Sequence, residues 1–143
     1  MCGIIGINSN KQVTASIINS LKKLEYRGYD SAGLATLSNG SINEIKTEGR
    51  VDKLEKSLLL QNIEGSIGIG HVRWATHGVP NSLNAHPHSS NNVSVVHNGI
   101  IENSTILKKF LIGKGHVFKS QTDTEVIVHL ITEHLKTDSY VDA

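Results

Sequence analysis

The residue best suited to catalysis is Cys2, the single cysteine among 143 residues, which directly follows Met1. Removal of the initiator methionine would give Cys2 a free α-amine beside its own thiol. An α-amine titrates near pH ~7.7–8.0, and a thiol is a good nucleophile as the thiolate, so one residue could supply both base and nucleophile. Gly3 leaves room for a substrate. The alternative for a lone cysteine is a small hydrophobic side chain packed in the core.

A second group of polar residues lies at the ends of expected strands. Asn98 offers a side-chain amide and Gly99 an unobstructed backbone N–H, which together could form an oxyanion hole. The same pair is equally typical of an ordinary hairpin turn. Arg73 could bind a carboxylate through two parallel hydrogen bonds, or form a surface salt bridge. Asp123 is either a helix-terminus residue or, in one pocket with Arg73, a partner for the ammonium group of an amino acid.

The eight histidines raise the question of a metal site, above all at His86-Pro87-His88. The sequence lacks HExxH and a second cysteine, and His129 and His134 are five residues apart, which separates their faces on a helix. We therefore expect no metal and no cofactor. The glycines of IGIGH at 67–71 lack the GxxxxGK[ST] pattern of a phosphate loop, so no nucleotide site is expected.

Length and composition favour one globular domain, with 38% hydrophobic and 19% charged residues. A net charge of +1 without a basic block argues against a nucleic-acid partner. No apolar run approaches the ~20 residues of a membrane span, and no signal peptide precedes Cys2. A single cysteine cannot form an internal disulfide, which favours the cytoplasm.

Hydrophobic spacing predicts the elements that must position these residues. The first half is expected to hold strands over 2–8, 32–37, 42–45 and 66–72, and helices over 13–25 and 51–60. Asn39-Gly40 is a strong hairpin signal between two of the strands. Residues 73–92 are expected to form a long functional loop.

The second half is expected to hold strands over 93–97 and 116–119 and helices over 103–113 and 126–135. Asn103 is expected to cap the first helix, with Gly113 as its end, and Thr122-x-x-Glu125 fits a capping box for the second. Hairpins and meanders with helices between them indicate an α+β fold with antiparallel sheets covered by helices.

Six sequence blocks, taken together, resemble one known family. They are MCGIIGI at the start, LEYRGYDSAGLA (24–35), HVRWATHG (71–78), NAHPH (84–88), VVHNGIIEN (95–103) and QTDTEVI (121–127). Their order and content are similar to the glutaminase domain of the glucosamine-6-phosphate synthase family, the glutamine–fructose-6-phosphate aminotransferases. These are class II glutamine amidotransferases with the N-terminal-nucleophile hydrolase fold. The resemblance implies a four-layer αββα sandwich with two antiparallel sheets.

The resemblance also implies a role for each matching residue. Cys2 would be the nucleophile with its own α-amine as base, and Asn98 and Gly99 would form the oxyanion hole. The remaining roles are the α-carboxylate site (Arg73, with Thr76 and His77 beside it), backbone contacts to glutamine (Trp74), the α-ammonium site (Asp123) and support next to the nucleophile (Arg27 and Gly28).

Glutamine is the implied substrate, and fructose 6-phosphate would be reached only through sugar-isomerase domains that this chain lacks. Residues 1–143 would then be a glutaminase domain without its C-terminal part, and the parent enzyme is expected to be a homo-oligomer. Amidophosphoribosyltransferase is an alternative, but its blocks typically read H-R-G-Q-D and R-Y-S-T, whereas this chain has Y-R-G-Y-D at 26–30 and R-W-A-T at 73–76. A non-catalytic glutamine-binding fragment is the alternative from another functional class.

Overall fold

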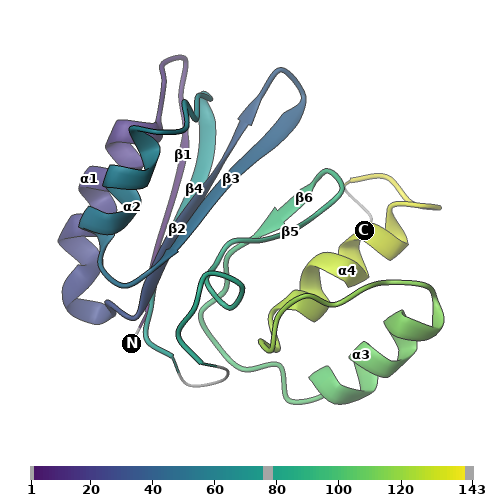
Figure 1. The fold of residues 1–143 in the computed structure, drawn as a ribbon. Helices are drawn as coiled ribbons and strands as arrows, with labels where there is room; N and C mark the ends of the chain where they lie inside the picture. Colours follow the sequence, from purple (N-terminus) through teal and green to yellow (C-terminus); the bar gives the residue numbers. More distant parts are fainter. Residues whose placement is uncertain (1, 76–78, 141–143) are drawn as a thin grey trace.

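The computed structural model describes residues 2–75 and 79–140, drawn as a ribbon in Figure 1. Six strands, four α-helices and one 3₁₀ turn follow one another along these residues. They are β1 (Gly3–Asn8), α1 (Thr14–Leu24), η1 (Glu25–Arg27), β2 (Ser31–Ser38), β3 (Ser41–Glu48), α2 (Val51–Leu58), β4 (Ile67–Arg73), β5 (His88–Ser90), β6 (Val93–Val95), α3 (Ser104–Gly113) and α4 (Glu125–His134).

The larger sheet has the order β1-β4-β2-β3, and every neighbouring pair is antiparallel. Strand β4 therefore lies between the strand that starts the chain and the β2–β3 hairpin. Asn39 and Gly40 form the hairpin turn with φ angles of 50° and 75°. Two consecutive positive φ values match the right-handed twist of the flanking strands, as the dipeptide predicts.

Helices α1 and α2 cover one face of this sheet (Figure 1). The predicted apolar stripe of α1 is confirmed, because Ile17 and Leu21 are completely buried there. Gly68 and Gly70 of β4 face the same helix, and a Cβ atom on either would lie 2.6 Å from Ile17. The alternation of glycine with isoleucine thus lets α1 pack directly on the backbone of β4.

A second layer lies against part of the other face of the sheet. The β5–β6 hairpin lies beside the larger sheet, α4 packs on the hairpin, and α3 packs on α4 (Figure 1). Lys46 of β3 donates a hydrogen bond to the Pro87 carbonyl at 3.0 Å, which ties the two sheets together. The expected α+β fold, with two antiparallel sheets between helices, is confirmed.

Two predicted segments differ from the structure. Residues 73–92, expected to be loop throughout, contain β5, which pairs with β6 through His88↔Val95 and Ser90↔Val93. Residues 116–119 form no strand, because the backbone N–H of His116 donates to the Leu111 carbonyl and that of Lys119 to the Glu125 carboxylate.

The predicted limits of α3 are confirmed, because Asn103 occupies its N-cap position and Gly113 is its last residue, although the Asn103 side chain makes no capping bond. The predicted capping box of α4 is wrong. Thr122 bonds to His88 at 2.8 Å instead of capping α4. Glu125 accepts hydrogen bonds from the backbone N–H groups of Lys119 and Ser120, so it anchors the segment before the helix. No described helix has both the length and the apolar character to span a membrane.

Candidate active site

Strand pairing brings the start of the chain next to the end of β4. In the antiparallel register Gly3 pairs with Val72, so Cys2 lies beside the segment that follows. The backbone N–H of Trp74 donates a hydrogen bond to Cys2 Sγ at 3.2 Å, and the carbonyl of Trp74 lies 3.6 Å from the same sulfur. The thiol is half-buried and forms no disulfide. A sheet register thus fixes the position of the candidate nucleophile.

A cavity of about 380 Å³ opens at this end of the sheet. Its walls combine residues from both halves of the chain, and seven of them are residues for which the resemblance implies a role. These are Cys2, Arg27, Arg73, Trp74, Asn98, Gly99 and Asp123. A volume of this size lies within the range of small-molecule sites.

Asn98 connects the thiol-bearing residue to the interior of the domain. Its Nδ2 donates to the carbonyl of Cys2 at 3.3 Å, and its Oδ1 lies 2.9 Å from Nε2 of the buried His71. Gly99 follows with the His97 ring against it, since a Cβ at this position would lie 2.7 Å from His97 Nε2. The side-chain N–H donor predicted from the sequence therefore lies next to Cys2.

Arg73 and Asp123 bring opposite charges to the same cavity. Arg73 is only 4% exposed, and burial lowers its pKa, while the negative charges of Cys2, Asp30 and Asp123 oppose that shift. Asp123 is held in place because its Oδ2 accepts the Ile101 N–H at 2.7 Å. A cation and a carboxylate at one cavity complement the two charged ends of a free amino acid.

The segment of Arg27 and Gly28 packs against the end of β4. Gly28 has no room for a side chain, since a Cβ would lie 2.7 Å from the carbonyl carbon of Arg73 and 2.8 Å from the nitrogen of Trp74. Arg27 lines the cavity, and its Nε donates to the Tyr26 hydroxyl at 3.1 Å. Gly28 thus allows a close approach to the backbone that holds the Cys2 sulfur.

The substrate loop predicted from the sequence is described in part. Trp74 is 45% exposed, and its ring meets the edge of Tyr29 with the centroids 5.9 Å apart. Asp30 accepts the Ala75 N–H at 2.8 Å, which fixes the start of the loop. Thr76 and His77, also expected at the substrate, lie outside the described residues.

Three buried histidines lie at or next to this site, although the sequence predicted no functional role for them: His71, His86 and His88. The His71 and His86 rings stack at 4.3 Å, and His86 meets the edge of His88 at 4.7 Å. Burial lowers the pKa of all three, to about 4 for His71 and His88. Their place inside two of the six blocks is the available signal, whereas, from the sequence, the histidines are considered only as metal ligands and that role is rejected.

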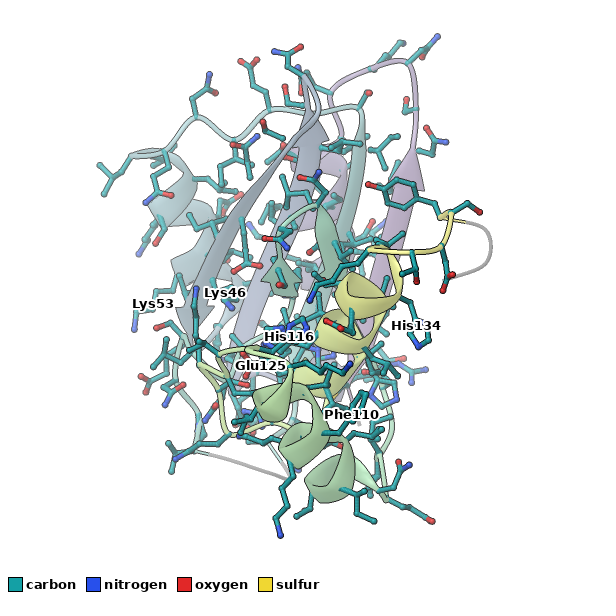
Figure 2. The ribbon with its side chains drawn as sticks, turned by 90° about the vertical axis from the view of Figure 1, so that its right-hand side faces the viewer. Lys46, Lys53, Phe110, His116, Glu125 and His134 are labelled. Carbon is teal, nitrogen blue, oxygen red and sulfur yellow. The ribbon has the colours of Figure 1, made fainter. Side chains whose placement is uncertain are left out.

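Within residues 2–75 and 79–140, no group of three or more His, Cys, Asp or Glu side chains is arranged to hold a metal ion. A second cavity of about 430 Å³ lies between the β5–β6 turn and α4. Figure 2 labels two of its wall residues, His116 and Glu125. No cysteine is among its described wall residues.

Two solved structures share this fold with the chain. Glutamine phosphoribosylpyrophosphate amidotransferase from B. subtilis superposes with a TM-score of 0.82 and 28% identity, covering 99% of this chain and 31% of that one. A structure described as the allosteric regulatory enzyme of purine biosynthesis gives 0.81 and 29%, with the same coverage. The fold and the thiol-bearing cavity thus define the class of N-terminal-nucleophile amidotransferases.

The family model described as "Glutamine amidotransferase domain" matches residues 59–138, more than half of the chain. The chain therefore belongs to the glutamine amidotransferase domain family. Similar curated proteins are named glutamine–fructose-6-phosphate aminotransferase (isomerizing). Those of Mesorhizobium japonicum and Pyrococcus horikoshii are each 54% identical, over 94% and 100% of this chain. The chain spans 22% and 24% of their lengths, less than a quarter.

Proposed function

We propose that this chain is the nitrogen-donor part of a glutamine–fructose-6-phosphate aminotransferase and hydrolyses glutamine through a Cys2 thioester. The observation that carries the proposal is the convergence of Cys2, Asn98, Arg73 and Asp123 on one cavity. The first and last of these residues, Cys2 and Asp123, are 121 positions apart in the sequence, and the four side chains have complementary functional groups. A non-catalytic binding site would need the two charges but no thiol.

Substrate binding uses the charged walls of the cavity. The Arg73 guanidinium forms two parallel hydrogen bonds with the α-carboxylate of glutamine, with Thr76 and His77 nearby in sequence, and Asp123 accepts from the α-ammonium group. Backbone groups of Trp74 contact the substrate next to the sulfur of Cys2. The side-chain amide of glutamine then extends towards Cys2.

Acyl transfer follows from the same arrangement. After removal of Met1, the α-amine of Cys2 takes the thiol proton, and the sulfur forms a bond to the amide carbon. The oxyanion is stabilised by Asn98 Nδ2–H and the Gly99 N–H. The protonated α-amine of Cys2 then returns a proton to the leaving nitrogen of glutamine, the C–N bond breaks, and ammonia departs. Water then cleaves the thioester, which releases glutamate and regenerates the thiol.

Two features favour a sugar-aminating parent over an amidophosphoribosyltransferase. The block Y-R-G-Y-D at 26–30 follows the sugar-aminating pattern, and so does Trp74 beside Cys2. We further propose that residues 1–143 form part of the glutaminase domain and that fructose 6-phosphate binds isomerase domains outside them. The parent enzyme is proposed to be a homo-oligomer. A cytoplasmic location fits a nucleophile that must stay a reduced thiol.

The proposal is tested with the protein expressed from its complete coding sequence. Glutamine is supplied with fructose 6-phosphate or with phosphoribosyl pyrophosphate, and glutamate, ammonia and glucosamine 6-phosphate are measured. We expect glucosamine 6-phosphate with the first acceptor, no amination with the second, and no products from Cys2→Ala. Glutamine binding without ammonia release would establish the non-catalytic alternative. Residues 1–143 alone should release ammonia and form no amino sugar.

A further inference from the structure

The carboxamide of Asn98 presents a specific problem to an oxyanion hole. Its oxygen and nitrogen ends have nearly the same shape, yet only the NH₂ end can stabilise a negative oxygen. The direction of the amide must therefore be fixed by its partners. Nδ2 faces the carbonyl of Cys2 at 3.3 Å, and the oxygen end faces His71 Nε2 at 2.9 Å.

We propose that His71 is a positioning residue that holds the Asn98 amide with its NH₂ end towards Cys2, so that Asn98 can serve as an oxyanion donor. This inference rests on the proposed glutaminase function. His71 lies on β4 two residues before Arg73, so one strand carries both the positioning residue and the carboxylate-binding residue. His71 itself need not touch the substrate.

The direction of the amide depends on which ring nitrogen of His71 carries the proton. With a proton on Nε2, the ring donates to Asn98 Oδ1, and the NH₂ end is left for the site. With the proton on Nδ1, Nε2 becomes an acceptor and would attract the NH₂ end. The amide would then point its oxygen towards Cys2 and repel the developing oxyanion.

The surroundings of His71 favour the productive tautomer. The residue is 1% exposed, and burial lowers its pKa to about 4 against the opposing effect of the Asn98 bond, so the ring is neutral near pH 7. The NH₂ group of Asn98 donates to the Cys2 carbonyl, so its oxygen end faces Nε2 of His71 at 2.9 Å. An amide oxygen only accepts hydrogen bonds, so this contact is a hydrogen bond when the single ring proton is on Nε2.

The plane of the His71 ring is held by a second histidine, His86, which packs against its face. His86 stacks on His71 with an angle of 16° between the rings, and His88 meets the edge of His86. His88 in turn bonds to Thr122, the neighbour of Asp123. A Cβ on Gly33 of β2 would collide with the His86 carbonyl, so glycine at that position allows the loop to bring His86 onto His71.

A double-mutant cycle with Asn98 tests the proposal in the protein from its complete coding sequence. His71→Phe keeps a stacking ring without a donor, His71→Leu removes both, and His71→Gln retains an N–H donor. We expect kcat for glutamine hydrolysis to fall about 10- to 100-fold in the Phe and Leu variants, with KM within about twofold, because only the oxyanion donor is displaced. His71→Gln should recover part of kcat. His129→Phe, at a buried histidine in the other cavity, is the control and should leave kcat unchanged.

The second arm repeats the three His71 substitutions in an Asn98→Ala background. There the His71 substitutions should change kcat less than about twofold, since no amide remains to be oriented. If His71→Phe retains the wild-type kcat, or if its loss is the same with and without Asn98, His71 has no positioning role. Failure of the underlying function gives a different result, in which the wild type releases no ammonia or Asn98→Ala retains full kcat.

Discussion

The backbone N–H of Trp74 donates a hydrogen bond to the sulfur of Cys2 at 3.2 Å, across 72 positions of sequence. Because the donor is a backbone group at the end of β4, substitution of the tryptophan ring does not remove it. The surroundings of the Cys2 sulfur therefore depend on the path of the main chain at Arg73 and Trp74, against which Gly28 packs.

This arrangement predicts that Gly28→Ala is damaging. The added Cβ would lie 2.7 Å from Arg73 and 2.8 Å from Trp74, so the backbone that faces the sulfur has to move. We expect a fall in kcat/KM for glutamine of at least tenfold and a loss of about 1–3 kcal/mol of stability. Steady-state kinetics and thermal unfolding measure the two effects.

Gly113→Ala in α3 is the matched control, because a Cβ there meets nothing within 4 Å. Alanine in a helix is about 1 kcal/mol more favourable than glycine, so this variant should be slightly stabilised and fully active. Equal behaviour of the two variants would contradict the packing argument.

Binding and chemistry should separate by residue. Arg73→Ala and Asp123→Ala are expected to raise KM for glutamine most strongly, because their charge pairs exist before and during the reaction. Asn98→Ala should lower kcat about 10²- to 10³-fold with little change in KM, because its bond strengthens only as the oxyanion forms. Initial rates over a range of glutamine concentrations distinguish the two patterns. A rise in KM alone for Asn98→Ala would disprove the oxyanion assignment.

Activity should require a free amino group on Cys2. We expect an intact mass without Met1 in active protein, and full activity in a sample that retains Met1 would exclude the α-amine as base. Cys2→Ser should be far slower, because a hydroxyl has a much higher pKa than a thiol and the same weak base must activate it. Single-turnover measurements with glutamine provide the comparison.

Acid should weaken the core of the site before it affects most carboxylates. His71 and His88 have pKa values lowered to about 4 by burial, and burial lowers that of His86 further. Near pH 7 both folded and unfolded states leave these rings neutral. Between pH ~6.5 and about 4 the unfolded chain binds protons that the folded chain does not, so stability falls with pH by up to about 1.4 kcal/mol per unit for each histidine.

The charged groups around the stack act in both directions. Arg73 disfavours protonation of all three rings, Lys46 disfavours it at His88, and Glu125 favours it there. Amide hydrogen exchange of β4 at pH 7.5, 6.5 and 5.5, corrected for intrinsic rates, gives the opening free energy. His86→Phe should make its pH dependence shallower. Unchanged protection across this range in the wild type would contradict the prediction.

Short-range patterns predicted much of the fold. The helix expected over 13–25, the Asn39-Gly40 turn and the strand expected over 66–72 each follow from spacing within a few residues, and each is confirmed. The capping box of α4 was mispredicted because the Thr122 hydroxyl bonds to a distant group. Thr122 finds His88, 34 residues away, and no local pattern reports such a partner.

The site shows the same division. Residue types identified Cys2 and the Asn98-Gly99 pair as candidates, and the six blocks grouped them with Arg73 and Asp123. The proposed role of His71 needed the structure, because its contact with Asn98 joins β4 to the segment after β6, 27 residues away. The neutral state of the His71 ring also follows from its burial, and the neighbouring residues in the sequence do not indicate that burial.

The position of β1 in the larger sheet bears on how the protein is made. Of the strands that the structure describes, only β4 pairs with β1, and it begins at Ile67. A chain synthesised from its amino terminus therefore has no sheet partner for β1 until residues 67–73 have left the ribosome. Until then the first residues remain accessible to an enzyme that removes methionine. Under the proposed mechanism, removal of Met1 would thus precede the burial of Cys2.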